Sequence, residues 1–174
     1  MHDSRRLHQR YGRFGATLLG VVVALVSVAA QTGTPGSVAV GGDVAKPFTL
    51  TLADLRAMPR TTLKLGNAQR PAVYEGVLLA EVLKRAGAPI GPELSGPAVA
   101  SYVLATAADG YRALFALAEA DPEFTNGEIL IADTLDGKPL GEGQGPVRLV
   151  IPQDKRAARS VRMLQRIDVV QVKQ

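Results

Sequence analysis

Turn-forming residues divide the chain after residue 37 into short apolar segments, and this division constrains the fold more than any other feature. The 174 residues include 18 glycines and 11 prolines. Gly41-Gly42-Asp43, Asp109-Gly110 and Asp136-Gly137 each separate two apolar segments, as turns between strands do. The pattern predicts an α+β domain, in which a mixed sheet system is joined by two or three short helices.

Strands are expected where apolar residues alternate with polar ones or form short runs that turn residues bound. The expected strand segments are residues 38–40, 48–50, 61–66, 97–111, 112–117, 128–140, 147–152 and 167–172.

Three segments are predicted to be helical. Thr51 and Asp54 form a capping signal for a short helix that Pro59 ends. The clearest helical pattern covers residues 75–86, in which apolar side chains recur on one face and a glycine follows as the C-terminal cap. A third short helix is expected over residues 155–166.

The first thirty residues differ in kind from the rest. Four arginines and one aspartate precede residue 14, and residues 14–30 carry no charge and end in small side chains. This pattern predicts a secretory signal peptide, with an uncleaved N-terminal anchor as the alternative. Arg5-Arg6 also bear a weak resemblance to a twin-arginine export signal. We therefore expect a periplasmic or secreted protein that contacts a membrane only if residues 1–30 are retained.

Residues 31–37 are interpreted as a linker and residues 38–174 as one domain. The chain has 20 basic and 16 acidic residues; residues 1–30 hold four and one of these, which leaves 16 against 15. This near neutrality argues against nucleic acid as a partner. The chain contains no cysteine, and both histidines lie in the first ten residues, so a zinc or copper site has few available ligands. We expect no protein metal site.

Two pairs of residues are candidates for acid–base chemistry. Asp109 and Tyr111 are a possible acid and phenol facing a ligand, although the simpler interpretation is a tight turn with Tyr111 packed beside Tyr102. Asp133 and Asp136 are a possible carboxylate pair. Asp136 is more simply explained by the hairpin turn, which leaves Asp133 without a partner.

Glu119, Asp121 and Glu123 carry enough oxygen atoms to be a candidate calcium site. They lack the regular spacing and the acidic last ligand of a calcium-binding loop. A solvated acidic turn is therefore the preferred interpretation of this stretch.

Residues 143–161 combine a glycine-rich turn, an apolar strand and a run of basic residues. Gly145 could let the backbone approach a phosphate, while Arg148, Lys155 and Arg156 neutralise its charge. The segment matches neither the GxxxxGK[ST] nor the GxGxxG type of phosphate loop. On the local pattern alone, a solvated basic surface is the simpler interpretation.

Five segments in this order resemble the molybdopterin-binding domain of the sulfite oxidase family. They are VGGDVAKPFTLTLADLRAMP, YEGVLLAEVLKRAG, SYVLATAADGYRALFALAEADP, ILIADTLDGKPL and GPVRLVIPQDKRAARSVRMLQRIDVVQV. The resemblance extends from about Val38 to Val172. It implies a compact α+β domain that holds a molybdenum-chelating pterin dithiolene, with basic and backbone groups at the phosphate of the pterin.

The resemblance also implies a cysteine thiolate on the metal, from a segment that corresponds to residues 61–77. No cysteine occurs there. We therefore expect a domain that binds a pterin-type or other anionic small molecule and is not a competent molybdenum oxidoreductase alone. Two alternatives stay open: an oxidoreductase with a non-cysteine metal ligand, and an accessory or interaction module without cofactor.

Within the resemblance, residues 143–161 correspond to the region that faces the pterin. Lys155 and Arg156 are expected on a loop that can meet a ligand. Arg148, on a strand, is a candidate for the same ligand, with an outward-pointing side chain as the alternative.

Overall fold

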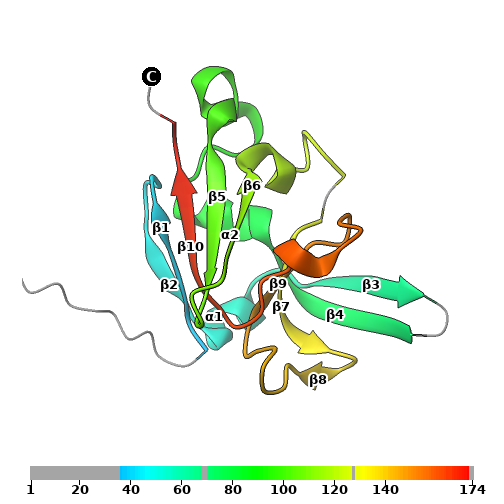
Figure 1. Ribbon diagram of the computed structural model, residues 1–174. Coiled ribbons are helices and arrows are strands. Elements are labelled where there is room, and N and C mark those ends of the chain that lie inside the picture. Colours follow the sequence, from blue (N-terminus) through cyan, green and yellow to red (C-terminus); the bar gives the residue numbers. More distant parts are fainter. Residues whose placement is uncertain (1–35, 68–69, 127, 173–174) are drawn as a thin grey trace, which may run out of the picture. The chain divides into compact units, whose positions relative to one another are not determined.

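Two five-stranded sheets and two short α-helices make up the part of the chain that the structure, a computed structural model, describes: residues 36–67, 70–126 and 128–172 (Figure 1). The predicted signal peptide and residues 31–35 of the predicted linker lie outside the described residues. Within them, no helix combines the length and the hydrophobicity needed to cross a membrane.

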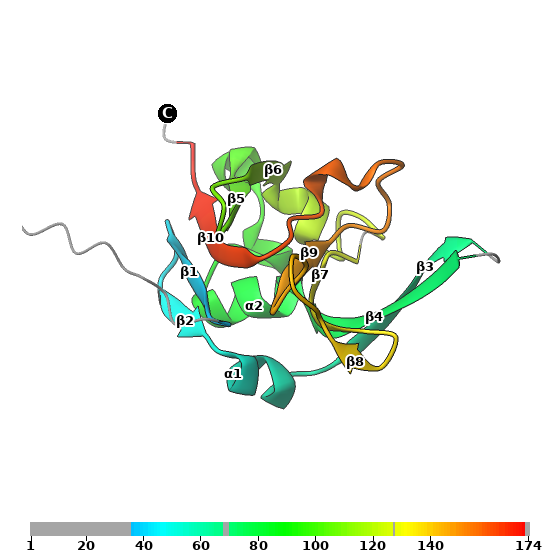
Figure 2. The same ribbon diagram turned by 60° about the horizontal axis from the view of Figure 1, so that its bottom comes forward.

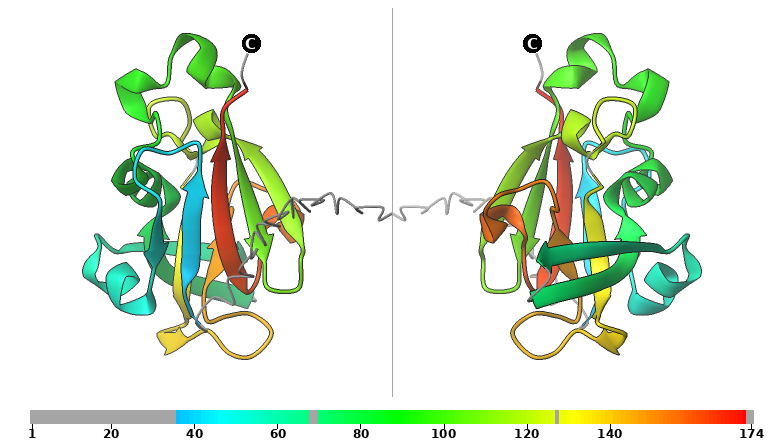
Figure 3. Two further views of the ribbon diagram at one scale, coloured as in Figure 1. Left: turned by 90° about the vertical axis from the view of Figure 1, so that its left-hand side faces the viewer. Right: turned by 90° about the vertical axis from the view of Figure 1, so that its right-hand side faces the viewer.

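The first sheet contains β1 (Val38–Gly42), β2 (Phe48–Leu50), β5 (Tyr102–Ala107), β6 (Arg112–Ala116) and β10 (Leu164–Val170). Its strand order is β2-β1-β10-β5-β6, with β1 and β10 parallel and the other neighbours antiparallel. Figure 3 shows β1 and β10 next to each other in this sheet. Strands from opposite ends of the described chain therefore form its centre.

The second sheet contains β3 (Thr61–Asn67), β4 (Arg70–Leu78), β7 (Leu130–Leu135), β8 (Lys138–Pro139) and β9 (Arg148–Val150). Its order is β3-β4-β7-β8, and β9 also pairs with β7. All of these pairings are antiparallel. The long hairpin of β3 and β4 extends away from the first sheet (Figure 2).

The helices are short. The described residues contain α1 (Leu52–Ala57), α2 (Leu79–Ala86) and four 3₁₀ segments, η1 (Gly91–Glu93), η2 (Gly96–Ala100), η3 (Leu117–Ala120) and η4 (Ala157–Arg159).

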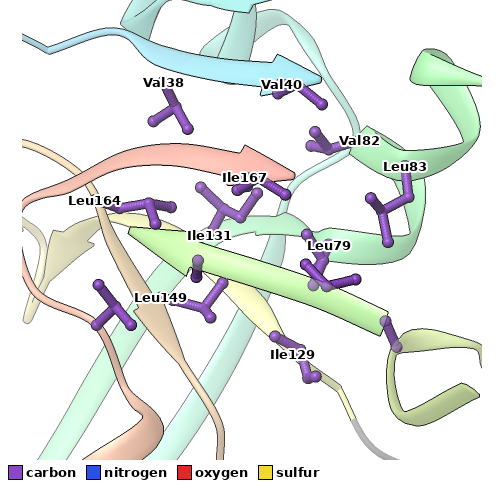
Figure 4. Packing of buried hydrophobic residues seen from close by; sticks show 14 of the residues in the cluster. Val38, Val40, Leu79, Val82, Leu83, Ile129, Ile131, Leu149, Leu164 and Ile167 are labelled. Carbon is purple, nitrogen blue, oxygen red and sulfur yellow. The ribbon is translucent and has the colours of Figure 1, made fainter. Parts of the chain in front are cut away.

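One hydrophobic core joins both sheets and α2 (Figure 4). Leu83 of α2 is fully buried, as the helical spacing predicted, and belongs to the same cluster as Val40 and Ile167 of the first sheet and Ile131 and Leu149 of the second. A smaller cluster, Leu63, Leu130, Ala132 and Val150, lies on the second sheet, with Tyr74 packed against it.

The local signals of the sequence are confirmed where they involve neighbouring residues. The Thr51 hydroxyl accepts a hydrogen bond from the Asp54 amide at 3.1 Å, and the Asp54 carboxylate accepts one from the Thr51 amide at 3.1 Å. The two form a capping box at the start of α1. Gly87 ends α2 in a left-handed conformation with φ 69°.

The predicted helix over residues 75–86 is wrong at its start. Residues 75–78 belong to β4, a strand that the sequence analysis did not predict, and α2 begins at Leu79. Gly76 explains the difference, because it lies directly against β7: a Cβ there would be 2.1 Å from the carbonyl oxygen of Ile131. Pairing with β7 overrides the helical spacing of these residues.

The predicted helix over residues 155–166 is also wrong. This segment contains only the single turn η4, and β10 already begins at Leu164. Met163 has a positive φ of 48°, which an α-helix does not accommodate. Residues 96–100, expected mainly in a strand, form η2 instead, with Pro97 in its first turn.

Candidate functional site: a pocket lined by arginines

A pocket of about 560 Å³ opens between the β5–β6 turn, the loop before β9 and the segment after it. The turn contributes Asp109 and Tyr111, the loop contributes Gln144, and β9 contributes Arg148. The segment between η4 and β10 adds Ser160, Arg162 and Met163. The volume lies within the range of small-molecule sites, about 300–1,000 Å³.

Arg148 is the most unusual of these residues because its charged side chain is buried, with only 8% of the residue exposed. Nη1 donates hydrogen bonds to the Tyr74 hydroxyl at 3.1 Å and to Oε1 of Gln144. The guanidinium carbon lies 5.1 Å from the centre of the Tyr74 ring. Nε is buried and has no hydrogen-bond partner among the described residues.

No carboxylate compensates this buried charge within the part of the chain that the structure describes. Burial lowers the pKa of Arg148 from its ordinary value, Tyr74 opposes this change, and the charge of Arg162 adds to it. Arginine nevertheless keeps its charge in proteins. A buried cation without a counter-charge is costly, so an anion in the pocket would be stabilised.

Arg162 and Ser160 supply further donors to the same pocket. Arg162 is exposed and, like Arg148, forms no ion pair with another described residue. The Ser160 oxygen accepts a hydrogen bond from the Ile151 amide at 3.1 Å, which leaves its O–H available to donate outward. Two positive charges and a hydroxyl therefore line one pocket.

A family model described as oxidoreductase molybdopterin-binding domain matches residues 33–174. The chain belongs to this family. The resemblance predicted from the five sequence segments is thereby confirmed.

A crystal structure of the sulfane dehydrogenase SoxCD from Paracoccus pantotrophus is similar to the chain, with a TM-score of 0.60 and 22% sequence identity. The match covers 77% of this chain and 38% of that chain. At this identity the similarity shows the fold, and the predicted α+β class is confirmed. A comparison with curated proteins finds no match.

The structure brings some of the predicted ligand-binding residues of this family member together and separates others. Asp109, Tyr111 and Arg148 line the pocket. Lys155 and Arg156 are exposed and are not among the lining residues. The alternative in which Arg148 points outward is wrong, because its side chain lies on the face of the second sheet that carries Tyr74 and is covered there.

Gly145 has a packing reason for being glycine. A Cβ at this position would lie 2.5 Å from the Cβ of Leu140. The close approach of a phosphate to Gly145 stays a prediction.

Sequence reasoning did not select Gln144, Ser160 and Arg162. A signal was present, because Val161 is apolar and buried between two polar neighbours that line the pocket. Such alternation in extended backbone places Ser160 and Arg162 on one side.

The candidate carboxylate pair does not assemble. Asp133 is buried and is bound by Arg60 through two hydrogen bonds of 2.6 and 3.1 Å, so its partner is an arginine and not a second carboxylate. Asp136 accepts a hydrogen bond from the Val73 amide at 2.8 Å in the hairpin turn. Both carboxylates stabilise the second sheet.

The acidic stretch near residue 120 also has a structural use. Asp121 is fully buried, not solvated, and accepts hydrogen bonds from the amides of Gly91 at 2.6 Å and Glu123 at 2.9 Å. Glu119 binds Arg159 at 2.9 Å. In residues 36–67, 70–126 and 128–172, no three histidine, cysteine or acidic residues gather as a metal site.

The pocket fits the anionic part of a molybdopterin but not its metal centre. Arg148, Arg162 and Ser160 suit a phosphate, because charge-assisted hydrogen bonds to phosphate oxygens are strong. The metal end lacks the thiolate that the resemblance implies, since the 174 residues contain no cysteine. Asp109 is the one carboxylate among the residues that line the pocket.

Proposed function

We propose that this chain is an exported domain that binds a phosphate-bearing small molecule of the pterin type in the Arg148 pocket. The observation that carries the proposal is the buried guanidinium of Arg148, which faces a pocket and has no carboxylate partner among the described residues. A phosphate would supply the missing negative charge, and Arg162 and Ser160 would share it.

The remaining wall suits the heterocycle of such a ligand. Tyr111 offers an aromatic surface, and its hydroxyl donates a hydrogen bond of 2.6 Å to the Ala158 carbonyl, which fixes the ring. Gln144 and Asp109 carry oxygen atoms that can accept hydrogen bonds from ring N–H groups. The arginines would provide affinity for the phosphate. The wall with Tyr111, Gln144 and Asp109 would discriminate among phosphate-bearing molecules that differ in their heterocycle.

We assign no reaction step at molybdenum, because the chain has no cysteine to hold the metal. A bound pterin dithiolene would have to retain molybdenum without a protein thiolate. The domain by itself is therefore proposed to bind ligand without acting as a sulfite oxidase.

Phosphate titration of the purified protein tests the proposal. Inorganic phosphate is expected to bind. Arg148→Met is expected to weaken binding at least about tenfold, because it removes the buried positive charge of the protein that would pair with the phosphate. The unfolding temperature of Arg148→Met should not fall, since replacing an uncompensated buried charge with an apolar side chain of similar length is often neutral or stabilising.

Arg85→Met is the matched control for this titration. Arg85 pairs with Asp54 at 3.3 Å and does not line the pocket, so this variant should bind phosphate like the wild type. Equal phosphate affinity in the wild type and Arg148→Met, or no binding in either, would overturn the proposed function.

A further inference from the structure

Residues 152–160, here called the strap, form one wall of the pocket. They supply Ala157, Ala158 and Ser160 to its lining. The strap holds one turn of 3₁₀ helix, and its backbone hydrogen bonds to itself and to its ends are few and local, such as Ser160 N–H to the Ala157 carbonyl at 3.1 Å. Its position therefore depends strongly on side-chain contacts.

Arg159 makes the most extensive of these contacts. Nε and Nη2 donate to the two carboxylate oxygens of Asp154 at 3.0 and 2.7 Å, which closes the strap on itself. Nη1 donates to both oxygens of Glu119 at 3.2 and 2.9 Å, which ties the strap to η3. All three guanidinium nitrogens are thus used, and none of them faces the pocket.

Two further hydrogen bonds act on the pocket side of the strap. The Tyr111 hydroxyl donates to the Ala158 carbonyl at 2.6 Å, and the Ile151 amide donates to the Ser160 oxygen at 3.1 Å. In the chain, Arg159 lies between Ala158 and Ser160, the two strap residues that make these hydrogen bonds. The contacts of Arg159 with Asp154 and Glu119 therefore also hold the neighbouring backbone, which presents Ser160 to the pocket.

The arginines near the pocket divide into two kinds. Arg159 has two carboxylate partners. Its hydrogen bonds to Asp154 raise its pKa above the ordinary value; burial opposes this change and Glu119 supports it. Arg148 and Arg162 have no carboxylate partner among the described residues. Asp154 and Glu119 are committed to the strap, and Asp109, the one carboxylate that lines the pocket, accepts a hydrogen bond from the Tyr111 amide at 2.9 Å. None of the three pairs with Arg148 or Arg162, so the pocket arginines are available to an anion.

We propose that Arg159 is a positioning residue for the anion pocket, acting through Asp154 and Glu119 to hold the strap in its ligand-binding position. The inference rests on the proposed function. A preordered wall binds more tightly because the ligand does not have to order it. Loss of the clamp should lower affinity without removing any group that touches the ligand.

Calorimetric titration with inorganic phosphate and hydrogen exchange of the strap amides test this inference. Arg159→Ala is expected to weaken phosphate binding roughly three- to tenfold, the range that corresponds to ordering a short segment. Exchange at residues 153–160 should become faster. Arg85→Ala, which removes another arginine–aspartate pair, should change neither measurement.

A double-mutant cycle separates positioning from general destabilisation. Ser160→Ala should cost less affinity in the Arg159→Ala background than in the wild type, because Ser160 is no longer held in place. Additive effects of the two changes would overturn the inference. Glu119→Gln removes the charge and one of the two acceptor oxygens from the tie to η3, and keeps one oxygen that can accept the hydrogen bond from the Ala116 amide. It repeats the test with a weakened tie should Arg159→Ala fail to fold.

The outcomes also separate this inference from the proposed function. No phosphate binding by the wild type would overturn both. Binding that needs Arg148 but is unchanged in Arg159→Ala and Glu119→Gln would overturn the positioning role alone.

Discussion

Asp133 and Arg148 show how differently two buried charges are treated in this fold. Both lie on the second sheet, and both are almost fully covered. Asp133 receives two hydrogen bonds from Arg60 and one of 2.8 Å from Thr134. Arg148 has only neutral partners among the described residues. The first charge therefore stabilises the fold, whereas the second is suited to a ligand.

The Asp133 ion pair predicts a specific dependence of stability on pH. Burial alone raises the pKa of Asp133, but the hydrogen bonds from Arg60 and Thr134 and the charges of Arg60 and Arg56 outweigh it and hold the pKa below its ordinary value. A lowered carboxyl pKa adds stability above the unfolded value, about 3.9, and this stability is lost as the pH falls through the folded value.

Urea unfolding of Asp133→Asn at several pH values measures the effect. At pH 7 the variant should be about 2 kcal/mol less stable, because it leaves a partly exposed Arg60 unpaired. The difference from the wild type should shrink below pH 4. Asp168→Asn, which breaks an exposed pair within β10, should cost under about 0.5 kcal/mol. A constant difference from pH 7 to pH 2 would contradict this account.

At the scale of residues, contacts between side chains that are close in the sequence were easier to predict than contacts between distant ones. The Thr51–Asp54 capping box was predicted because its partners are three residues apart. The burial of Arg148 was not, because its aromatic partner Tyr74 lies far away in the sequence and meets it only across the second sheet.

At the scale of elements, turns were easier to predict than the strands and helices that they join. The Asp136-Gly137 hairpin was predicted from two residues with strong conformational preferences. Residues 75–78 fit both a helix and a strand, and their pairing with β7 decides between them. The strap carries a helical composition but has no apolar face to bury, so ion pairs determine its path.

The exposed cations of the strap are expected to act on the rate of ligand association. Lys155 and Arg156 lie next to pocket residues in the chain without lining the pocket. Replacing both with alanine should lower the association rate of phosphate roughly two- to fivefold and reduce its salt dependence, because long-range attraction is screened by ions. The dissociation rate should hardly change.

Replacing Lys84 and Arg85 of α2 with alanine is the matched control, since it also removes one lysine and one arginine charge, but from another exposed site. Stopped-flow measurements at low and high salt compare the two double variants. Identical association rates in both would mean that net charge alone, rather than the strap, attracts the anion.

At the scale of the whole molecule, the family was recognisable because five weak segments occur in one order. No single segment determines the pocket, which draws on the β5–β6 turn, β9 and the strap. Its assembly depends on both sheets and was therefore beyond local pattern reasoning. Asp109, Tyr111 and Arg148 were candidates from local sequence patterns, whereas Arg162 was identified as a pocket residue only through the fold.

The missing cysteine leads to an expectation for the intact protein. Purified from its native host, the protein should contain well below one molybdenum atom per chain and should not oxidise sulfite, because no thiolate is available to hold the metal. The proposed export separately predicts a mature chain that begins near Gln31. Mass spectrometry, elemental analysis and a sulfite assay provide the three measurements. Molybdenum near one atom per chain with lasting turnover would instead favour a non-cysteine metal ligand.

The parallel pairing of β1 with β10 has a consequence for the order in which the chain folds. β10 lies between β1 and β5, so the hairpins β1–β2 and β5–β6 share no edge until residues 164–170 join them. A growing or translocating chain that lacks these residues has two separate ribbons with unpaired edges, a state that invites aggregation. The first sheet can therefore be completed only after β10 is available to pair with β1 and β5. A chaperone that shields the unpaired edges of these two strands would raise the yield of folded protein.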